Sequence, residues 1–199
     1  MMADIGKINE LVVIKEVDFG LYLDGGDLGS ILLPKRYVPE GAKLDDTLSV
    51  FLYTDSEDRY IATTETPTIK AGEFALLKIL EVNNIGAFAE WGLSKDLFIP
   101  FREQRHELNA GDTTVVYAYF DEESERVVGS TKLNKYLNKR EVDVKNGDEV
   151  DLIIFARTDL GYNAIVNHAF SGVIFFSDVF QKLSHGKTLK GYIKNVRPD

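Results

Sequence analysis

A glycine and a proline that recur at one fixed spacing constrain the fold of this chain more than any other feature of its sequence. The stretch FGLYLDGGDLGSILLP ends at Pro34, and the similar stretch IGAFAEWGLSKDLFIP ends at Pro100. Gly20 and Gly86 are 66 residues apart, and the two prolines have the same separation. A shared offset indicates an internal repeat, and a unit of this length is too long for a solenoid repeat. Each copy is therefore expected to be a small domain with its own core.

The repeat extends beyond these two landmarks. Arg59 and Arg126 each follow an acidic turn and are 67 residues apart. A third copy places its glycine at Gly161, 75 residues after Gly86, and the added residues fall in KLNKYLNKRE, which is typical of a basic linker or a short helix. The predicted units are residues 1–66, 67–131 and 147–199, with the linker at 132–146.

Each copy contains short apolar runs that alternate with a period of two. The first runs are ELVVIKEV, FALLKILEV and VDLIIFART, and turn signals follow every 8–12 residues. Long helical periodicity is absent, which argues against a fold of alternating strands and helices. Five strands in about 65 residues suit a small OB-type barrel, because closure removes exposed strand edges. The sequence therefore predicts an all-β protein made of tandem five-stranded OB-fold barrels.

The third copy ends early, because GYIKNVRPD directly follows its fourth strand. It is predicted to be a truncated barrel without its last strand, which leaves an edge of unpaired backbone groups. We expect that the fourth strand is poorly ordered or pairs with something outside its own unit. We also expect the chain to be a fragment of a longer protein.

Composition and motifs narrow the classes of function. The absence of cysteine excludes disulfides and thiolate metal sites and fits a reducing cytosol. The N-terminus lacks a signal-peptide pattern, and no apolar run approaches the ~18 residues of a membrane helix. His106, His168 and His185 share no metal-binding spacing, and nucleotide-loop and hydrolase motifs are absent. We expect a cytoplasmic protein that is not an enzyme, with no cofactor, metal, membrane partner or small-molecule substrate.

Charge is distributed unevenly along the chain. The net charge is −9, with −7 in residues 1–66, −5 in 67–130 and +3 in 131–199. An acidic protein is a less favourable partner for nucleic acid, but a local basic groove can still hold phosphates.

The repeated motif resembles a known domain. The pattern resembles the S1 RNA-binding domain. It consists of G-[AL]-[FY]-[AL] after the first strand, then an apolar strand, then GD-x-x-V, and then an arginine in the last strand. The order of three units with KLNKYLNK before the third, and the phrases DEVDLIIFARTDLGYNAIVN, DVFQKLSHG and GYIKNVRPD, are similar to the conserved virulence factor B family. These bacterial proteins have tandem S1 domains and a winged-helix domain. The resemblance implies RNA binding and post-transcriptional regulation of gene expression.

A barrel that binds single strands needs exposed rings for bases and cations for phosphates. In the first copy Tyr22 alternates with Leu21 and Leu23, so the leucines should face the core and the tyrosine the solvent. The candidate RNA-binding residues of the first unit are Phe19, Tyr22, Lys35, Arg36 and Arg59.

The later copies carry weaker versions of this surface. In the second, Ile85 replaces the first ring, and the candidates are Phe88, Arg102 and Arg126. In the third, Leu160 and Asn163 stand at the equivalent positions, so we expect the stacking rings to be lost. Its candidates suit phosphate better than bases, and they are Lys190, Tyr192, Lys194 and Arg197.

These residues also have a simpler structural interpretation. Aromatic side chains in small barrels are often packed, and Arg59 and Arg126 are placed to pair with the acidic turns beside them. Two functions therefore remain. One is a single-stranded RNA-binding protein, and the alternative is a protein–protein adaptor whose acidic first two units dock on ribosome or RNA polymerase components. Steep weakening of RNA binding between ~50 and ~200 mM salt would distinguish the first.

Overall fold

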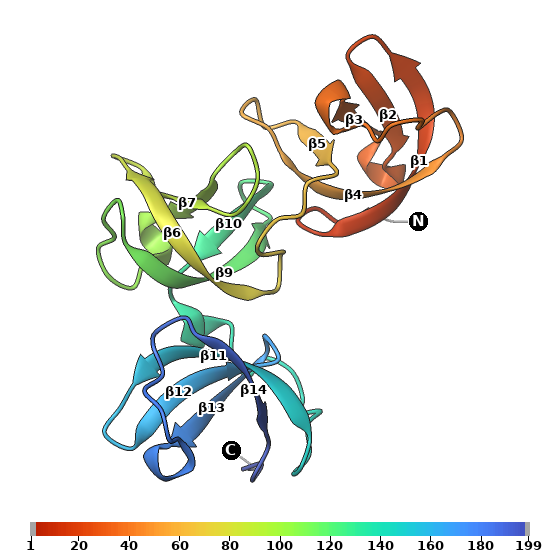
Figure 1. The fold of residues 1–199 in the computed structure, drawn as a ribbon. Helices are drawn as coiled ribbons and strands as arrows, with labels where there is room; N and C mark the ends of the chain where they lie inside the picture. Colours follow the sequence, from red (N-terminus) through yellow and green to blue (C-terminus); the bar gives the residue numbers. More distant parts are fainter. Residues whose placement is uncertain (1–2, 198–199) are drawn as a thin grey trace. The chain divides into compact units, whose positions relative to one another are not determined.

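The computed structural model describes residues 3–197, which form β-strands joined by turns and short 3-10 helices (Figure 1). The prediction of an all-β protein is confirmed, since these residues include no α-helix. No helix in this part of the chain has the length and hydropathy needed to cross a membrane. The 3-10 helices are η1 (Gly26–Leu28), η2 (Lys35–Tyr37), η3 (Phe101–Glu103), η4 (Leu133–Lys135) and η5 (Phe176–Asp178).

The first five strands close into barrel 1. They are β1 (Ile8–Val17), β2 (Gly20–Asp24), β3 (Ser30–Pro34), β4 (Thr47–Thr54) and β5 (Tyr60–Thr63). The strand order is β1-β2-β3-β5-β4, and β3 and β5 are parallel where Leu32 pairs with Ile61. Alternation places Val13, Leu23 and Leu33 in the core with no exposed surface, as expected for strands with one buried face.

The next five strands close into barrel 2. They are β6 (Phe74–Val82), β7 (Gly86–Glu90), β8 (Leu97–Pro100), β9 (Thr113–Asp121) and β10 (Arg126–Ser130). The order is β10-β8-β7-β6-β9, and β10 runs parallel to β8 where Val128 pairs with Phe98. Barrel 2 therefore repeats the topology of barrel 1, and the prediction of five-stranded barrels is confirmed for both.

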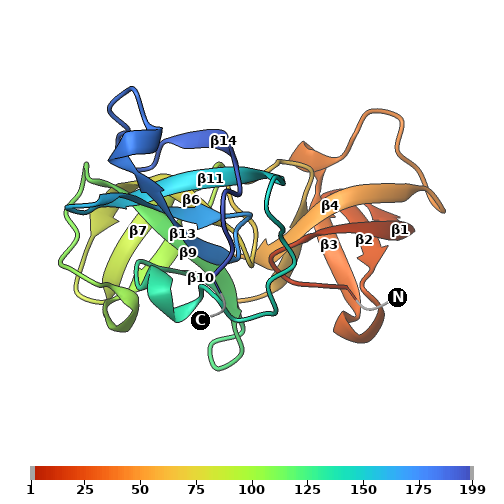
Figure 2. The ribbon, with the colours of Figure 1, turned by 90° about the horizontal axis from the view of Figure 1, so that it is seen from below.

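The third copy forms a four-stranded sheet. Its strands are β11 (Glu149–Arg157), β12 (Gly161–Val166), β13 (Phe170–Phe175) and β14 (Thr188–Tyr192), in the order β13-β12-β11-β14. The expectation that its fourth strand lacks order or a partner in its own unit is wrong. β14 pairs with β11 from Tyr192 opposite Glu149 to Thr188 opposite Ile153, and Figure 2 shows the two strands side by side. Strand four pairs with strand one in each copy, so the missing fifth strand does not deprive it of a partner.

The chain divides into two compact units that differ from the barrels. Unit 1 contains the chain up to Ala71 with Glu90–Phe98 and Ala118–Val128. Unit 2 contains Gly72–Ala89, Ile99–Tyr117 and the chain from Gly129 onward. Barrel 2 thus contributes segments to both units.

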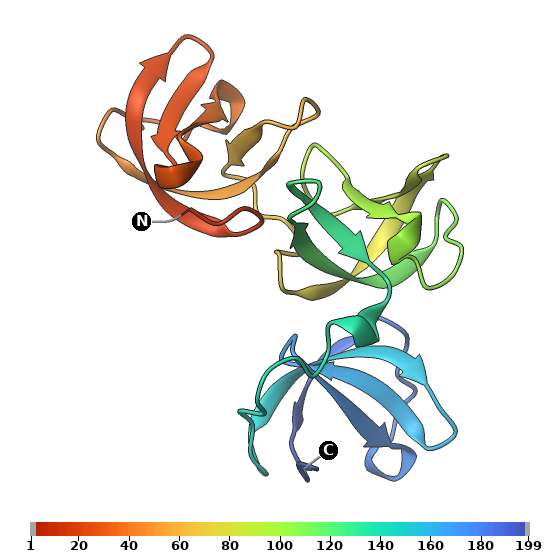
Figure 3. The same cartoon turned by 180° about the vertical axis from the view of Figure 1, so that it is seen from behind.

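The linker that leads from β10 to β11 is anchored in unit 2. It begins with η4, visible where the chain leaves β10 in Figure 3. Leu133 and Leu137 are buried in one cluster with Phe74, Ile153 and Ile165, which come from β6, β11 and β12. The basic residues of the linker are therefore carried on a segment fixed by two leucines.

The glycine that marks the first and third copies has a steric cause. A Cβ atom on Gly20 would lie 2.2 Å from the carbonyl oxygen of Leu33, and one on Gly161 would lie 2.0 Å from that of Ile174. In both cases the crowding atom belongs to the backbone of the neighbouring strand, which pairs with the glycine. The repeat landmark is therefore a position where two strands approach too closely for any side chain.

We expect Gly20→Ala to lower the free energy of unfolding by about 2 kcal/mol or more, because the strand pair must separate to admit the methyl group. Gly41→Ala is the matched control, since Gly41 has a φ of +80° but no atom within 4 Å of the added carbon. Chemical denaturation followed by circular dichroism measures both. Equal losses in the two variants would contradict the steric explanation.

Candidate functional site

Two aromatic rings share one exposed face of barrel 1. Phe19, in the turn between β1 and β2, is 58% exposed, and Tyr22 on β2 is half-buried. Their ring centroids are 6.4 Å apart in an edge-to-face arrangement. Leu21 and Leu23 point into the core, so the predicted alternation along this strand is confirmed. Both rings therefore retain surface on which a ligand can pack.

One predicted lysine lies beside this ring pair. The backbone N–H of Lys35, the first residue of η2, donates to the carbonyl oxygen of Phe19 at 2.9 Å. Lys35 is exposed, and its backbone is anchored at the turn that carries Phe19. Arg36 is held differently, because its guanidinium lies 4.6 Å over the ring of Tyr37 and donates to Ser94 Oγ at 3.3 Å. Lys35 therefore belongs to the face with the rings, whereas Arg36 is engaged by other residues of unit 1.

Arg59 is near the ring pair but already carries two carboxylate partners. It contacts Asp55 at 2.8 Å and Glu57 at 3.0 Å. The hydrogen bond and charge of Asp55, then the charge of Glu57, raise the pKa of Arg59, and Tyr22 adds a smaller electrostatic contribution. Arg59 therefore pairs with the acidic turn beside it, as the structural interpretation of this residue predicted. We call Phe19, Tyr22, Lys35 and Arg59 the barrel 1 face.

Barrel 2 presents a ring that the sequence reasoning missed. Phe88 on β7 is half-buried, and Ile85 before it is 56% exposed. Phe101 opens η3 and is 51% exposed, beside the exposed Arg102. Phe101 follows β8 as Lys35 follows β3, so the repeat offset of 66 residues was the signal that could have found it.

Arg126, at the start of β10, does not pair with the acidic turn that precedes it in the sequence. Its guanidinium forms an ion pair with Asp58, a residue of unit 1 that lies in the acidic turn of barrel 1. The prediction of a local partner for Arg126 is therefore wrong. The reason is tertiary, because the fold of unit 1 brings residues 68 positions apart together.

The basic strip on β14 is offset by carboxylates. Lys190 contacts Asp151 at 2.7 Å, and the hydrogen bond to this carboxylate raises the pKa of Lys190. The hydroxyl of Tyr192 donates to Glu149 at 3.0 Å, which raises the pKa of Tyr192. Lys194 lies 3.2 Å from Asp178. Arg197 is exposed beyond the strand. This strip is less suited to phosphate than its sequence suggested.

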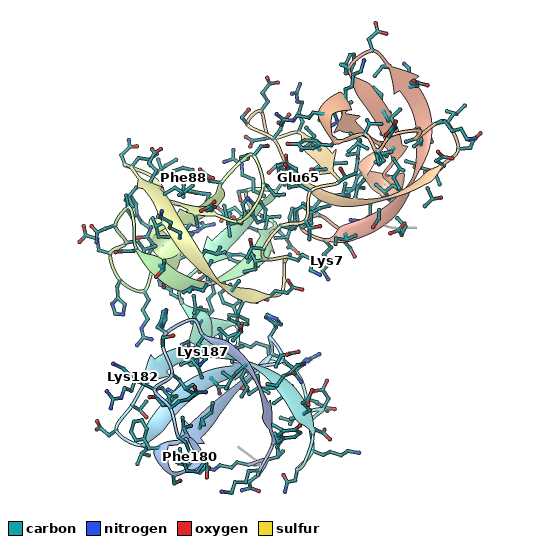
Figure 4. The ribbon with its side chains drawn as sticks, in the orientation of Figure 1. Lys7, Glu65, Phe88, Phe180, Lys182 and Lys187 are labelled. Atoms are coloured by element: carbon teal, nitrogen blue, oxygen red, sulfur yellow. The ribbon has the colours of Figure 1, made fainter. Side chains whose placement is uncertain are left out.

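The third unit has Leu160 and Asn163 at the positions equivalent to the barrel 1 rings, and it exposes rings at other positions. Phe176 opens η5 and is 39% exposed, and the guanidinium of Arg157 lies 5.3 Å over its ring. Gly161 pairs with Phe175 as Gly20 pairs with Pro34, so Phe176 stands where Lys35 stands in barrel 1. Phe180, labelled in Figure 4, is fully exposed in the segment between β13 and β14. The rings are present on the segment after the third strand instead of on the second strand.

The described residues include no group of three or more histidine, aspartate or glutamate side chains placed to hold a metal ion. The barrel 1 face itself offers two rings and two cations, and one of these cations, Arg59, is paired with carboxylates.

Comparison with known proteins supplies the family. The sequence model of the S1 domain family matches this chain twice, over residues 5–65 and 71–132. The uncharacterized protein YitL of Bacillus subtilis (strain 168) is 33% identical over 95 residues, which cover 47% of this chain and 32% of that protein. The crystal structure of a multidomain protein with nucleic acid binding domains from Streptococcus pneumoniae TIGR4 covers 98% of this chain and 70% of its own, with a TM-score of 0.56 and 18% identity.

These matches carry different weight. At 18% identity, the likeness to the Streptococcus structure shows the fold alone. The segment matched in the Bacillus protein spans about a third of that protein's length. The two S1 matches coincide with barrels 1 and 2 and together cover more than half of the chain. The chain therefore belongs to the S1 domain family.

Proposed function

We propose that this protein binds single-stranded RNA without catalysis and that the barrel 1 face is a principal contact. The observation that carries the proposal is the exposed pair of Phe19 and Tyr22 with Lys35 beside it. Membership of the S1 domain family supports it. The Streptococcus protein is described as a multidomain protein with nucleic acid binding domains, which agrees with this proposal.

The contacts of this face suggest how a strand binds. Unstacked bases pack against the two rings, an interaction worth roughly 1–3 kcal/mol per base. Lys35 meets a phosphate directly. Arg59 reaches a phosphate only by exchanging Asp55 or Glu57 for it, so its contribution to affinity is smaller than that of an unpaired arginine. Further weak contacts on the other barrels raise the apparent affinity if one strand spans them.

The biological role belongs to the same proposal. The third-copy phrases DVFQKLSHG and GYIKNVRPD support a relationship to the conserved virulence factor B family. On that basis we propose post-transcriptional regulation of gene expression in the cytoplasm of a bacterium.

We expect the double variant Phe19→Ala/Tyr22→Ala to bind single-stranded RNA tens of times more weakly, because two stacking surfaces are lost. Fluorescence anisotropy with a labelled RNA of roughly 12 nucleotides measures the dissociation constant. Leu44→Ala is the control, since it truncates a 51% exposed apolar side chain outside the barrel 1 face. Unchanged affinity of the double variant, with normal circular dichroism, would exclude this face as the binding surface.

The adaptor alternative is favoured by one observation. The first two thirds of the chain are acidic, and both Arg59 and Arg126 are paired with carboxylates. Such a surface suits a basic protein partner, for example a component of the ribosome or RNA polymerase. If the wild-type protein binds no RNA even at low salt, the adaptor function is preferred.

A further inference from the structure

We propose that a pocket in unit 2 binds one nucleotide of the RNA strand, at a site distinct from the barrel 1 face. This inference rests on the proposed function. The pocket has a volume of about 310 Å³, which is at the lower end of the range for small-ligand sites and suits a single nucleotide. Tyr117, Tyr136, Lys139, Arg140 and His168 contribute to its lining, and all five belong to unit 2.

Two stacked tyrosines form one wall. The rings of Tyr117 on β9 and Tyr136 after η4 are 4.2 Å apart and nearly parallel, and Phe74 packs against Tyr117 at 4.6 Å. The hydroxyl of Tyr136 donates to the buried carboxylate of Glu103 at 3.1 Å, which fixes that ring. Both tyrosines are half-buried, so each presents part of its ring to the pocket. Phe74 and Tyr136 already pack against Tyr117, and Lys135 Nζ lies 5.1 Å over the ring of Tyr136. The wall therefore meets a base with its ring edges, in the edge-to-face arrangement that aromatic pairs favour.

Two consecutive cations of the linker lie at the pocket. Lys139 is exposed and forms no ion pair with another of the described residues. Arg140 lies 5.2 Å over the ring of Phe170 and 3.5 Å from Asp143, and both partners of this pair are more than half exposed. Such a surface pair is weak, so the guanidinium can turn to a phosphate at little cost. The pocket therefore favours an anion.

His168 adds a hydrogen-bonding ring to the lining of the pocket. The Nδ1 atom of His168 accepts a hydrogen bond from the backbone N–H of Phe74 at 2.9 Å. Because an accepting Nδ1 carries no proton, Nε2 is the ring nitrogen that can donate. His168 is exposed, so Nε2 is the ring atom left for a ligand. Asn167 and His168 have φ values of +48° and +53°, and Ala169 N–H donates to Val166 O at 2.9 Å. The tight turn between β12 and β13 therefore holds the imidazole at the pocket.

The combination selects the ligand class. A small inorganic anion would use the cations and leave the tyrosines unused, and a neutral aromatic compound would leave the cations unused. A nucleotide uses both, with its phosphate toward Lys139, Arg140 and His168 and its base toward Tyr117 and Tyr136. Because residues 131–199 carry a net charge of +3, this part of the chain also attracts the strand more than the acidic barrels do.

The test compares two double variants of equal charge in the full chain. Lys139→Ala/Arg140→Ala removes the pocket cations, and Lys43→Ala/Lys145→Ala removes two exposed lysines outside the pocket and the barrel 1 face. We expect the pocket variant to bind labelled RNA about tenfold more weakly than the control, with a salt slope smaller by about 1.4 for two lost phosphate contacts. Photo-crosslinking with RNA containing 4-thiouridine should mark the peptide that contains Tyr136.

The outcomes separate this inference from the proposed function. If the pocket variant matches its control while Phe19→Ala/Tyr22→Ala still weakens binding, the nucleotide pocket is wrong and the barrel 1 face stands. If the wild-type protein binds no RNA, both fail. Loss of the Tyr136 crosslink in excess uridine 5′-monophosphate, with the strand still bound, would overturn the assignment to a strand and indicate a free nucleotide.

Discussion

Replacing Trp91 by alanine is expected to lower the free energy of unfolding by about 4 kcal/mol, the largest stability effect that this structure predicts. Trp91 directly follows β7, is 3% exposed and is the single tryptophan of the chain. Within unit 1 its ring meets Phe51 at 5.7 Å and Tyr53 at 6.4 Å, both edge-to-face. Its Nε1–H donates to the carbonyl oxygen of Lys95 at 2.5 Å. The variant therefore loses a large buried ring, two aromatic contacts and a hydrogen bond.

Chemical denaturation followed by far-ultraviolet circular dichroism measures this loss without needing the tryptophan signal. Phe180→Ala is the matched control, because it truncates an aromatic side chain that is 101% exposed, and it should change stability by less than about 0.5 kcal/mol. Trp91→Phe keeps a ring but not the donor and should cost less than the alanine variant. A loss below about 1 kcal/mol for Trp91→Ala would contradict the packing described for unit 1.

The second large effect is expected at Glu103, a buried carboxylate of unit 2. Glu103 is 5% exposed, and its carboxylate accepts hydrogen bonds from Lys135 Nζ at 2.8 Å and from the hydroxyl of Tyr136 at 3.1 Å. Glu103→Ala removes the acceptor of both side chains and should lower the free energy of unfolding by about 3 kcal/mol. Glu107→Ala is the control, since Glu107 is an exposed carboxylate on the same segment.

The effect of Glu103 should depend on pH. Burial alone would raise the pKa of Glu103, but the hydrogen bonds from Lys135, Ser130 and Tyr136 and the charge of Lys135 together hold it below its ordinary value of 4.5. A carboxylate whose folded pKa is depressed contributes stability that is present above its unfolded pKa and is lost as pH falls through the folded pKa. The difference between wild type and Glu103→Ala should therefore be full above pH 4.5 and shrink below it. A difference that grows on acidification would contradict this.

The local pattern of the strands could be predicted from the sequence because side chains in a strand alternate with a period of two. That rule placed Leu21 and Leu23 in the core and Tyr22 at the surface. The fixed offset between copies predicted the common topology, and the structure adds its cause at Gly20 and Gly161, where a Cβ atom would collide with the next strand. These features depend on neighbours that are close in the sequence or on one strand pair.

The electrostatic partners could not be predicted in the same way. Arg126 pairs with Asp58 and Lys190 with Asp151, and in each case the tertiary fold brings together residues that lie far apart in the sequence. Phe101 and Phe176 were missed for a different reason. The predicted rings lie in the turn before the second strand, on that strand or on the last strand of the third copy, whereas Phe101 and Phe176 lie in the 3-10 turn after the third strand. The pocket beside Tyr136 is formed by residues from β9, the linker and the β12–β13 turn, which no local pattern connects.

The most direct test of the account is to map the amide signals that shift when single-stranded RNA is added to the isotope-labelled protein. We predict that shifts gather at Phe19, Tyr22 and Lys35, because the strand stacks on this ring pair and places a phosphate at the lysine. These shifts should weaken as salt rises, since phosphate contacts release counterions. Saturable RNA binding that leaves these three residues unshifted would contradict the claim that barrel 1 offers its exposed rings to the strand.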